Sequence, residues 1–333
     1  MGDAPAGAGP VTPDAQAQRL IDAVEIAGRP DFSELTPAEA RIAFDRSIEA
    51  LGGGREELAA VAEGTLAGAA GPRPIRLYRP LAGPTPAPAL LWMHGGGFVF
   101  GSLASYDGFC RALANRSQCT IVALDYRLAP EHPFPAGADD CLAAWRDLHA
   151  RAGELGLDRD RLAIGGDSAG GSLAAGLTLA ARAGGAPVPR FALLVYPGVG
   201  MDTSTESHRR FASGYLLTRR TIDWCYRHYT GGGPPPRDVR FAPLVAPDLS
   251  GLPPCCIVVA GCDPLHDEGV AYARRLREAG VAVELLDYAS TVHGFMLFPG
   301  VLDVATEAIA AAGERLARAL AVREMRAVSP VRP

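Results

Sequence analysis

Short apolar runs alternate with helical stretches from about residue 73 onward, and this alternation restricts the fold more than any other feature of the chain. Turn residues bound the apolar runs, which cover residues 75–79, 89–93, 120–124, 162–164, 191–196, 255–260 and 281–286. Runs of this length are typical of buried parallel strands. Helical periodicity occurs between them, at about 137–151, 169–183, 265–279 and 302–322. We therefore predict a doubly wound α/β fold with a mostly parallel central sheet flanked by helices.

Two segments do not follow this alternation. Residues 1–50 are helical and amphipathic after an Ala/Gly/Pro-rich start, with Thr36 as an N-cap for a helix that ends at about Leu51. Residues 200–240 are rich in aromatic side chains and contain a Gly-Gly-Gly-Pro-Pro-Pro break. We predict that these two segments form a helical cap over an α/β domain made of residues 51–199 and 241–333. The alternative for 200–240 is one long crossover connection with ordinary packing aromatics.

The charge of the chain argues against several partners. The 333 residues carry a formal net charge of −5 and have no basic run, so we expect no binding to nucleic acid. Every basic residue is an arginine. The absence of lysine excludes a P-loop lysine, a Schiff-base lysine and a kinase lysine.

The N-terminus and the cysteines indicate the cellular location of the protein. Residues 1–10 lack the basic and apolar regions of a secretory signal, and no apolar run reaches the length of a bilayer span. The seven cysteines include no C-x-x-C pair, so we expect neither a zinc nor a thioredoxin motif. We predict a cytoplasmic protein with reduced thiols, without a membrane span and without a metal.

Residues 166–170, Gly-Asp-Ser-Ala-Gly, match a nucleophile elbow. The pattern is weak alone, and its alternative is a glycine-rich strand–helix turn. Its context is that of an elbow, because an apolar strand precedes Ser168 and a helix-forming run follows it. A serine at such a turn exposes its hydroxyl at the C-terminal edge of the sheet. We predict Ser168 as a nucleophile.

Residues 94–97, His-Gly-Gly-Gly, are a more specific signal and follow the 89–93 strand directly. A run of glycines lets backbone N–H groups point at one spot, as an oxyanion hole requires. The predicted donors are the N–H groups of Gly96, Gly97 and Ala169. His94 is a weak candidate for a base, and we expect it to order the loop.

The order of residues in such folds, nucleophile then acid then base, selects the other two groups. Of the histidines after Ser168, His293 lies in a short loop after the last strand. Asp263 comes just past the 255–260 strand, at the same edge of the sheet as Ser168. We predict His293 as the base and Asp263 as the acid that orients it. Asp287 is the second candidate for the acid.

These motifs resemble the bacterial hormone-sensitive-lipase-like esterases, which have the α/β-hydrolase fold. The resemblance spans roughly residues 75–300 and includes 94–98, Asp-Tyr-Arg-Leu-Ala-Pro-Glu at 125–131, 166–170, Asp-Pro-Leu at 263–265 and His-Gly-Phe at 293–295. The Gly-Asp-Ser-Ala-Gly sequence indicates the subgroup of this family that carries that elbow. The family's nucleophile, acid and base fall on Ser168, Asp263 and His293.

The resemblance implies hydrolysis of short- to medium-chain carboxylic esters, a small-molecule substrate, no cofactor and a cap. It also allows a homodimer, since members of the family often pair through a sheet edge. An amidase or peptidase would use the same triad, and a non-catalytic binding protein on this scaffold, such as the plant gibberellin receptors, is the alternative from another class. Pocket depth is expected to depend on the side chains Phe32, Phe44, Phe211, Tyr215 and Leu216.

The stretch 125–136 contains charged and proline residues, and we expect it to be structural. Arg127 is expected to pair there with Glu131 or Asp125.

Overall fold

A computed structural model describes residues 11–200 and 202–321 of the chain. These residues contain an eight-stranded sheet of order β1-β2-β4-β3-β5-β6-β7-β8. The pairs β1–β2 and β2–β4 are antiparallel, and the other five pairs are parallel. The predicted mostly parallel sheet is therefore confirmed. Its strands are β1 (Ala60–Gly68), β2 (Gly71–Arg79), β3 (Ala87–Met93), β4 (Thr120–Leu124), β5 (Leu157–Asp167), β6 (Ala192–Val195), β7 (Cys255–Cys262) and β8 (Val283–Val292).

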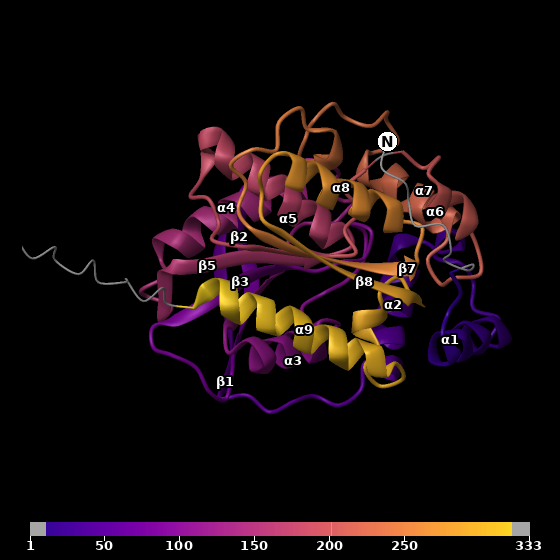
Figure 1. The fold of residues 1–333 in the computed structure, drawn as a ribbon, viewed down its shortest axis with the longest axis horizontal. Helices are drawn as coiled ribbons and strands as arrows, with labels where there is room; N and C mark the ends of the chain where they lie inside the picture. Colours follow the sequence, from indigo (N-terminus) through magenta and orange to yellow (C-terminus); the bar gives the residue numbers. More distant parts are fainter. Residues whose placement is uncertain (1–10, 201, 322–333) are drawn as a thin grey trace, which may run out of the picture.

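Helices cover both faces of the sheet (Figure 1). One face packs against α4 (Ala136–Ala150), α5 (Ala169–Ala180) and α8 (His266–Glu278), and the other against α3 (Asp107–Ser117) and α9 (Asp303–Leu320). Successive strand residues point to opposite faces, so Leu91 is buried in one core cluster and Trp92 in the other. Because both faces are buried, the central strands are continuously apolar.

The helices of residues 11–51 and 202–229 lie near the end of the sheet toward which the arrows of β7 and β8 point (Figure 1). They are α1 (Ala15–Ile26), α2 (Pro37–Leu51), α6 (Glu206–Arg210) and α7 (Arg219–Tyr229). Helix α2 begins as predicted, because Thr36 and Glu39 form a reciprocal capping box. Residues 1–10 and 201 of the predicted cap lie outside the described residues.

One strand and one α-helix were not predicted. Strand β1 is an edge strand with a largely exposed surface, and Leu66 is its buried residue. It therefore lacks the apolar run that marked the other strands. Helix α3 was also missed, although Phe109, Cys110, Leu113 and Ala114 recur at helical spacing and are buried on one face.

The expected partners of Arg127 were wrong. Its guanidinium pairs with Asp140 of α4, with Nε 2.7 Å from Oδ2. Glu131 pairs instead with Arg41 of α2, at 2.6 Å. Both partners are distant in sequence and are brought near by the packing of helices.

Candidate active site

Ser168 lies at the sharp turn between β5 and α5. Its backbone has φ of 53° and ψ of −119°, a strained combination for a residue with a side chain. The Ser168 N–H donates to the carbonyl of Val195 at 2.8 Å, which holds the turn against β6. A Cβ atom on Gly170 would lie 2.0 Å from the carbonyl oxygen of Met93, so only glycine lets α5 approach β3 this closely. The sequence pattern of the elbow thus has a steric reason.

His293 connects the serine to a buried carboxylate. It follows β8, and its Nε2 lies 2.9 Å from Ser168 Oγ. Its Nδ1 lies 2.7 Å from Oδ2 of Asp263, which is fully buried. The other oxygen of Asp263 accepts a hydrogen bond from the Leu265 N–H at 2.8 Å. Because a carboxylate only accepts, the imidazole carries its hydrogen on Nδ1 and presents the lone pair of Nε2 to the serine.

The reserve candidates lie elsewhere. Asp287 faces His266, with its Oδ2 3.3 Å from Nε2 of that ring. His94 is buried, donates from Nδ1 to the carbonyl of Gly95 at 2.8 Å and stacks on Tyr126. Burial lowers the pKa of His94, which favours the neutral ring. The structure therefore brings together Ser168, His293 and Asp263, and it brings neither Asp287 nor His94 to the serine.

The glycine loop after β3 lies beside the elbow. Gly96 and Gly97 have φ of 105° and 57°, a region that glycine enters without strain. Their N–H groups and that of Ala169 donate to no protein acceptor in the described part of the chain. All three residues line the same cavity as Ser168 and His293. Ala169 also begins α5, where the helix dipole favours negative charge.

This cavity has a volume of about 820 Å³ and contains the serine and the imidazole in its wall. Its other walls come from α1, η1 (Phe32–Glu34), α2 and residues between Gly214 and Tyr226. Mostly apolar side chains line it, among them Leu20, Phe32, Phe44, Phe100, Leu216 and Ile222. Three of the five expected depth-setting residues, Phe32, Phe44 and Leu216, therefore contact the cavity.

The expectation was wrong for the other two. Phe211 and Tyr215 do not line the cavity and stack edge-to-face on each other with ring centroids 4.9 Å apart. They pack beside Ile21 of α1, in a small cluster of their own.

Two buried carboxyl groups near the site, those of Asp167 and Glu268, had no predicted role. Asp167, directly before the serine, accepts hydrogen bonds from the Gly95 N–H and the Tyr106 hydroxyl, and burial raises its pKa to about 7. Glu268 accepts from the Gly200 N–H at 2.7 Å, and burial raises its pKa to about 8. The available signal for Asp167 was a charged residue at the end of an apolar strand.

The described residues, 11–200 and 202–321, contain neither a candidate metal site nor a helix that could span a membrane. No three His, Cys, Asp or Glu side chains are grouped there in a way that could hold a metal ion. No helix in those ranges is both long enough and apolar enough to cross a membrane. All seven cysteines are buried free thiols.

The eight-stranded sheet, the strained serine elbow and the adjoining glycine loop together define an α/β hydrolase. The family model described as alpha/beta hydrolase fold matches residues 90–297 of this chain. The chain belongs to this family, and its resemblance to the hormone-sensitive-lipase-like esterases is confirmed.

Named relatives cover most of the chain. An ethyl acetate hydrolase of Pseudomonas putida is 40% identical over 317 residues, which are 92% of this chain and 98% of that protein. A carboxylic ester hydrolase of Mycobacterium tuberculosis is 44% identical over 239 residues, 70% of this chain and 63% of that protein. A solved ester hydrolase from the metagenome of Lake Arreo has a TM-score of 0.88 and 40% identity, and the match covers 92% of this chain and 99% of that one.

Proposed function

We propose that the protein is a serine carboxylesterase that hydrolyses short- to medium-chain carboxylic esters through an acyl-enzyme. The observation that carries this proposal is the continuous hydrogen-bond chain from Ser168 through His293 to Asp263 beside a largely apolar cavity. The names of the relatives, an ethyl acetate hydrolase and a carboxylic ester hydrolase among them, support the ester as the substrate class.

Acylation begins when Ser168 Oγ attacks the ester carbonyl carbon while His293 Nε2 removes its proton. The carbonyl oxygen becomes negative and accepts hydrogen bonds from the N–H groups of Gly96, Gly97 and Ala169. Asp263 stabilises the imidazolium and keeps the ring in the required orientation. The imidazolium then protonates the alkoxide leaving group, the C–O bond breaks, and the acyl group stays on the serine.

Deacylation repeats these steps with water as the nucleophile. His293 removes a proton from the water, the same N–H groups stabilise the second oxyanion, and the acid product leaves as Ser168 regains its proton. Every catalytic group that these reaction steps require is a side chain or backbone amide of the chain itself. We therefore propose that the reaction uses no cofactor.

Several further properties are part of the proposal. The walls supplied by residues 11–50 and 214–226 support a cap made of residues 1–50 and 200–240, above a catalytic domain of 51–199 and 241–333. The sequence of residues 166–170 supports membership of the Gly-Asp-Ser-Ala-Gly subgroup. A homodimer, a cytoplasmic location and the absence of nucleic-acid binding stay predictions.

The direct test is hydrolysis of p-nitrophenyl esters of increasing acyl length by the wild type and by Ser168→Ala. We expect activity on the short and medium chains and a loss of several orders of magnitude in kcat in the variant. Ser250→Ala, which removes an exposed hydroxyl, is the matched control and should retain wild-type activity.

The alternative functions, an amidase or peptidase and a non-catalytic binding protein, would give different results in this assay. An amidase or peptidase would cleave these activated esters too, but it would also turn over p-nitroanilides of the same acyl groups, which a carboxylesterase leaves essentially intact. A binding protein would turn over neither. Either result, obtained with a folded wild type, would contradict the proposal.

A further inference from the structure

We propose that Asp167 and Tyr106 are a positioning pair that holds the glycine loop of residues 94–97 in register with the nucleophile. The inference rests on the proposed function of Ser168, and it assigns a role to two buried side chains that the triad does not use. Neither is proposed to take part in the chemistry directly, because both act through the backbone of Gly95.

The two side chains form a closed set of short hydrogen bonds with Gly95. The Gly95 N–H donates to Asp167 Oδ1 at 2.8 Å and is shared with the Tyr106 hydroxyl oxygen at 2.9 Å. The Tyr106 hydroxyl donates to Asp167 Oδ2 at 2.7 Å. Both side chains are almost completely buried. Hydrogen bonds to a buried carboxyl are costly to lose, because the group left behind has no water to replace them.

These hydrogen bonds connect two functional motifs because of where the bonded residues lie in the sequence. Asp167 directly precedes Ser168, and Gly95 directly precedes Gly96. One carboxyl group therefore joins the nucleophile elbow to the loop that supplies two of the three proposed oxyanion donors. An oxyanion hole works only when its donors are held at hydrogen-bond distance from the developing charge. A bond that fixes the loop relative to the serine should therefore affect the transition state more than substrate binding.

Gly95 leaves no space for any other residue at this junction. A Cβ atom there would lie 2.5 Å from Asp167 Oδ2 and 2.8 Å from the Tyr106 hydroxyl oxygen. The second residue of the His-Gly-Gly-Gly motif is thus glycine because a buried carboxyl and a phenol pack directly against its backbone. The contact links two motifs that are 72 residues apart.

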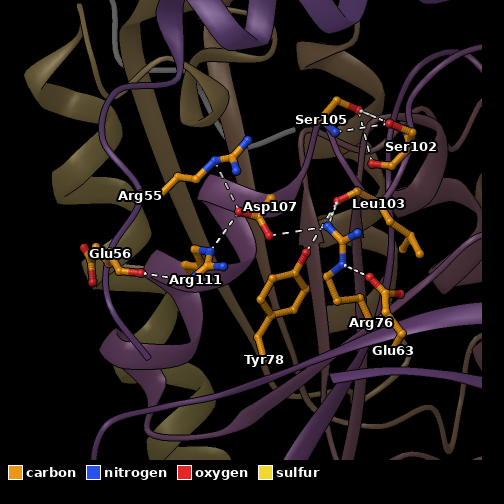
Figure 2. A network of polar contacts seen from close by, with 10 residues as sticks. All are labelled: Arg55, Glu56, Glu63, Arg76, Tyr78, Ser102, Leu103, Ser105, Asp107 and Arg111. Carbon is orange, nitrogen blue, oxygen red and sulfur yellow. Dashed lines mark hydrogen bonds and ion pairs between the residues drawn. The ribbon is translucent and has the colours of Figure 1, made fainter. Parts of the chain in front are cut away.

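Tyr106 directly precedes α3, and Figure 2 shows the polar contacts of residues on either side of it, among them Leu103, Ser105 and Asp107. The next residue, Asp107, forms ion pairs with Arg55, Arg76 and Arg111 at 3.4, 3.4 and 2.8 Å. Arg76 also donates to the carbonyl of Leu103, in the turn that leads to Tyr106. These contacts hold the backbone on both sides of the tyrosine, from which the hydroxyl reaches Asp167.

The test compares Asp167→Ala, Asp167→Asn and Tyr106→Phe with the wild type on one p-nitrophenyl ester. We expect Asp167→Ala to lower kcat by about 100-fold and Tyr106→Phe by about 10-fold, with KM changed less than about twofold, since losing one oxyanion donor costs about 100- to 1,000-fold. Asp167→Asn keeps an oxygen that can accept from Gly95, so it should recover much of the activity that Asp167→Ala loses.

A second readout separates oxyanion stabilisation from general loss of structure. A trifluoromethyl ketone analogue of the ester is attacked by Ser168 Oγ, whose proton passes to His293, and the product is a hemiketal oxyanion. Its inhibition constant should rise by the factor by which kcat/KM falls. The inhibition constant of the corresponding unreactive amide should stay within about twofold of its wild-type value. A neutral carbonyl oxygen depends less than an oxyanion on the hydrogen-bond donors.

Controls make the outcomes distinct. Tyr272→Phe removes the hydroxyl of another buried tyrosine, in α8, and reports the effect of stability alone. Unchanged kcat in folded Tyr106→Phe and Asp167→Ala, or a loss that follows melting temperature as in Tyr272→Phe, would overturn the inference. A rise in KM with unchanged affinity for the ketone would do so as well. Failure of the proposed function is seen separately, as inactivity of the wild type or full activity of Ser168→Ala.

Discussion

At the scale of single residues, the orientation of His293 depends on a carboxylate that is out of contact with water. Asp263 is fully buried and accepts from both the imidazole and the Leu265 N–H. Such a group keeps one tautomer of the ring because the alternative would place a lone pair against a negative oxygen. In the proposed mechanism this acid therefore acts through the imidazole, without touching the ester.

Asp263→Asn should lower kcat by about 10⁴-fold with little change in KM, since the amide would favour the wrong tautomer of His293. Steady-state kinetics on a short-chain ester measure the effect. Asp287→Asn is the matched control, because Asp287 lies nearby in the sheet but faces His266. It should keep near-wild-type turnover, and an equal loss in both variants would contradict the assignment.

At the scale of elements, two segments far apart in sequence are joined over the cavity. The side chain of Asp31 accepts hydrogen bonds from the Ser33 N–H and the Thr221 hydroxyl, both at 2.9 Å. It also accepts from the hydroxyl of Thr218, the N-cap of α7. One carboxylate thus caps η1 and ties it to the beginning of α7. Burial opposes ionisation of Asp31, but its hydrogen bonds prevail and lower its pKa.

Asp31→Ala should lower the free energy of unfolding by about 1–2 kcal/mol, because a cap and a tertiary contact are lost together. Amide hydrogen exchange should rise in α7 and stay unchanged in α9, which packs on the opposite face of the sheet. Asp22→Ala, on the exposed side of α1, is the control. Unchanged exchange in α7 would show that Asp31 does not hold the two segments together.

Helix α2 is attached to the loop regions below it by Arg41. Its Nε donates to the carbonyl of Val99 at 2.9 Å, just beyond the glycine loop, and its guanidinium also pairs with Glu131. Glu131 therefore joins helix α2 to the stretch 125–131, through a partner that sequence spacing did not indicate.

At the scale of the whole molecule, one buried acid should influence how stability varies with pH. Burial raises the pKa of Glu268 from an ordinary value of 4.5 to about 8. Between these two pH values the folded state keeps a proton that the unfolded chain has released. Stability contributed by this group is therefore present below about pH 4.5 and decreases as the pH rises toward 8.

Glu268→Gln should remove this contribution, which is at most about 1.4 kcal/mol per pH unit. Urea unfolding of wild type and variant at pH 5, 6.5 and 8 measures the difference in slope. Glu278→Gln, an exposed residue at the end of the same helix, should leave the slope unchanged. Parallel pH profiles for wild type and Glu268→Gln would contradict the prediction.

The sequence by itself was sufficient for seven of the eight strands, the elbow and the three residues now found in hydrogen-bond contact. Buried parallel strands must be apolar on both faces, so they leave a pattern that can be recognised along the chain. Ser168, Asp263 and His293 each directly follow a strand of the parallel part of the sheet, and the carboxyl ends of parallel strands meet at one edge. Their convergence could therefore be predicted from order alone.

Contacts between side chains distant in sequence were decided by the tertiary structure. No spacing rule connects Asp167 to Tyr106, Arg41 to Glu131 or Asp31 to Thr221, because each pair is formed by elements whose packing angle depends on the whole core. The same holds for the cavity wall, which includes Phe44 and leaves out Phe211. A helix or loop shows its apolar residues in the sequence, but only its packing determines whether each of them faces a neighbour, the solvent or the substrate.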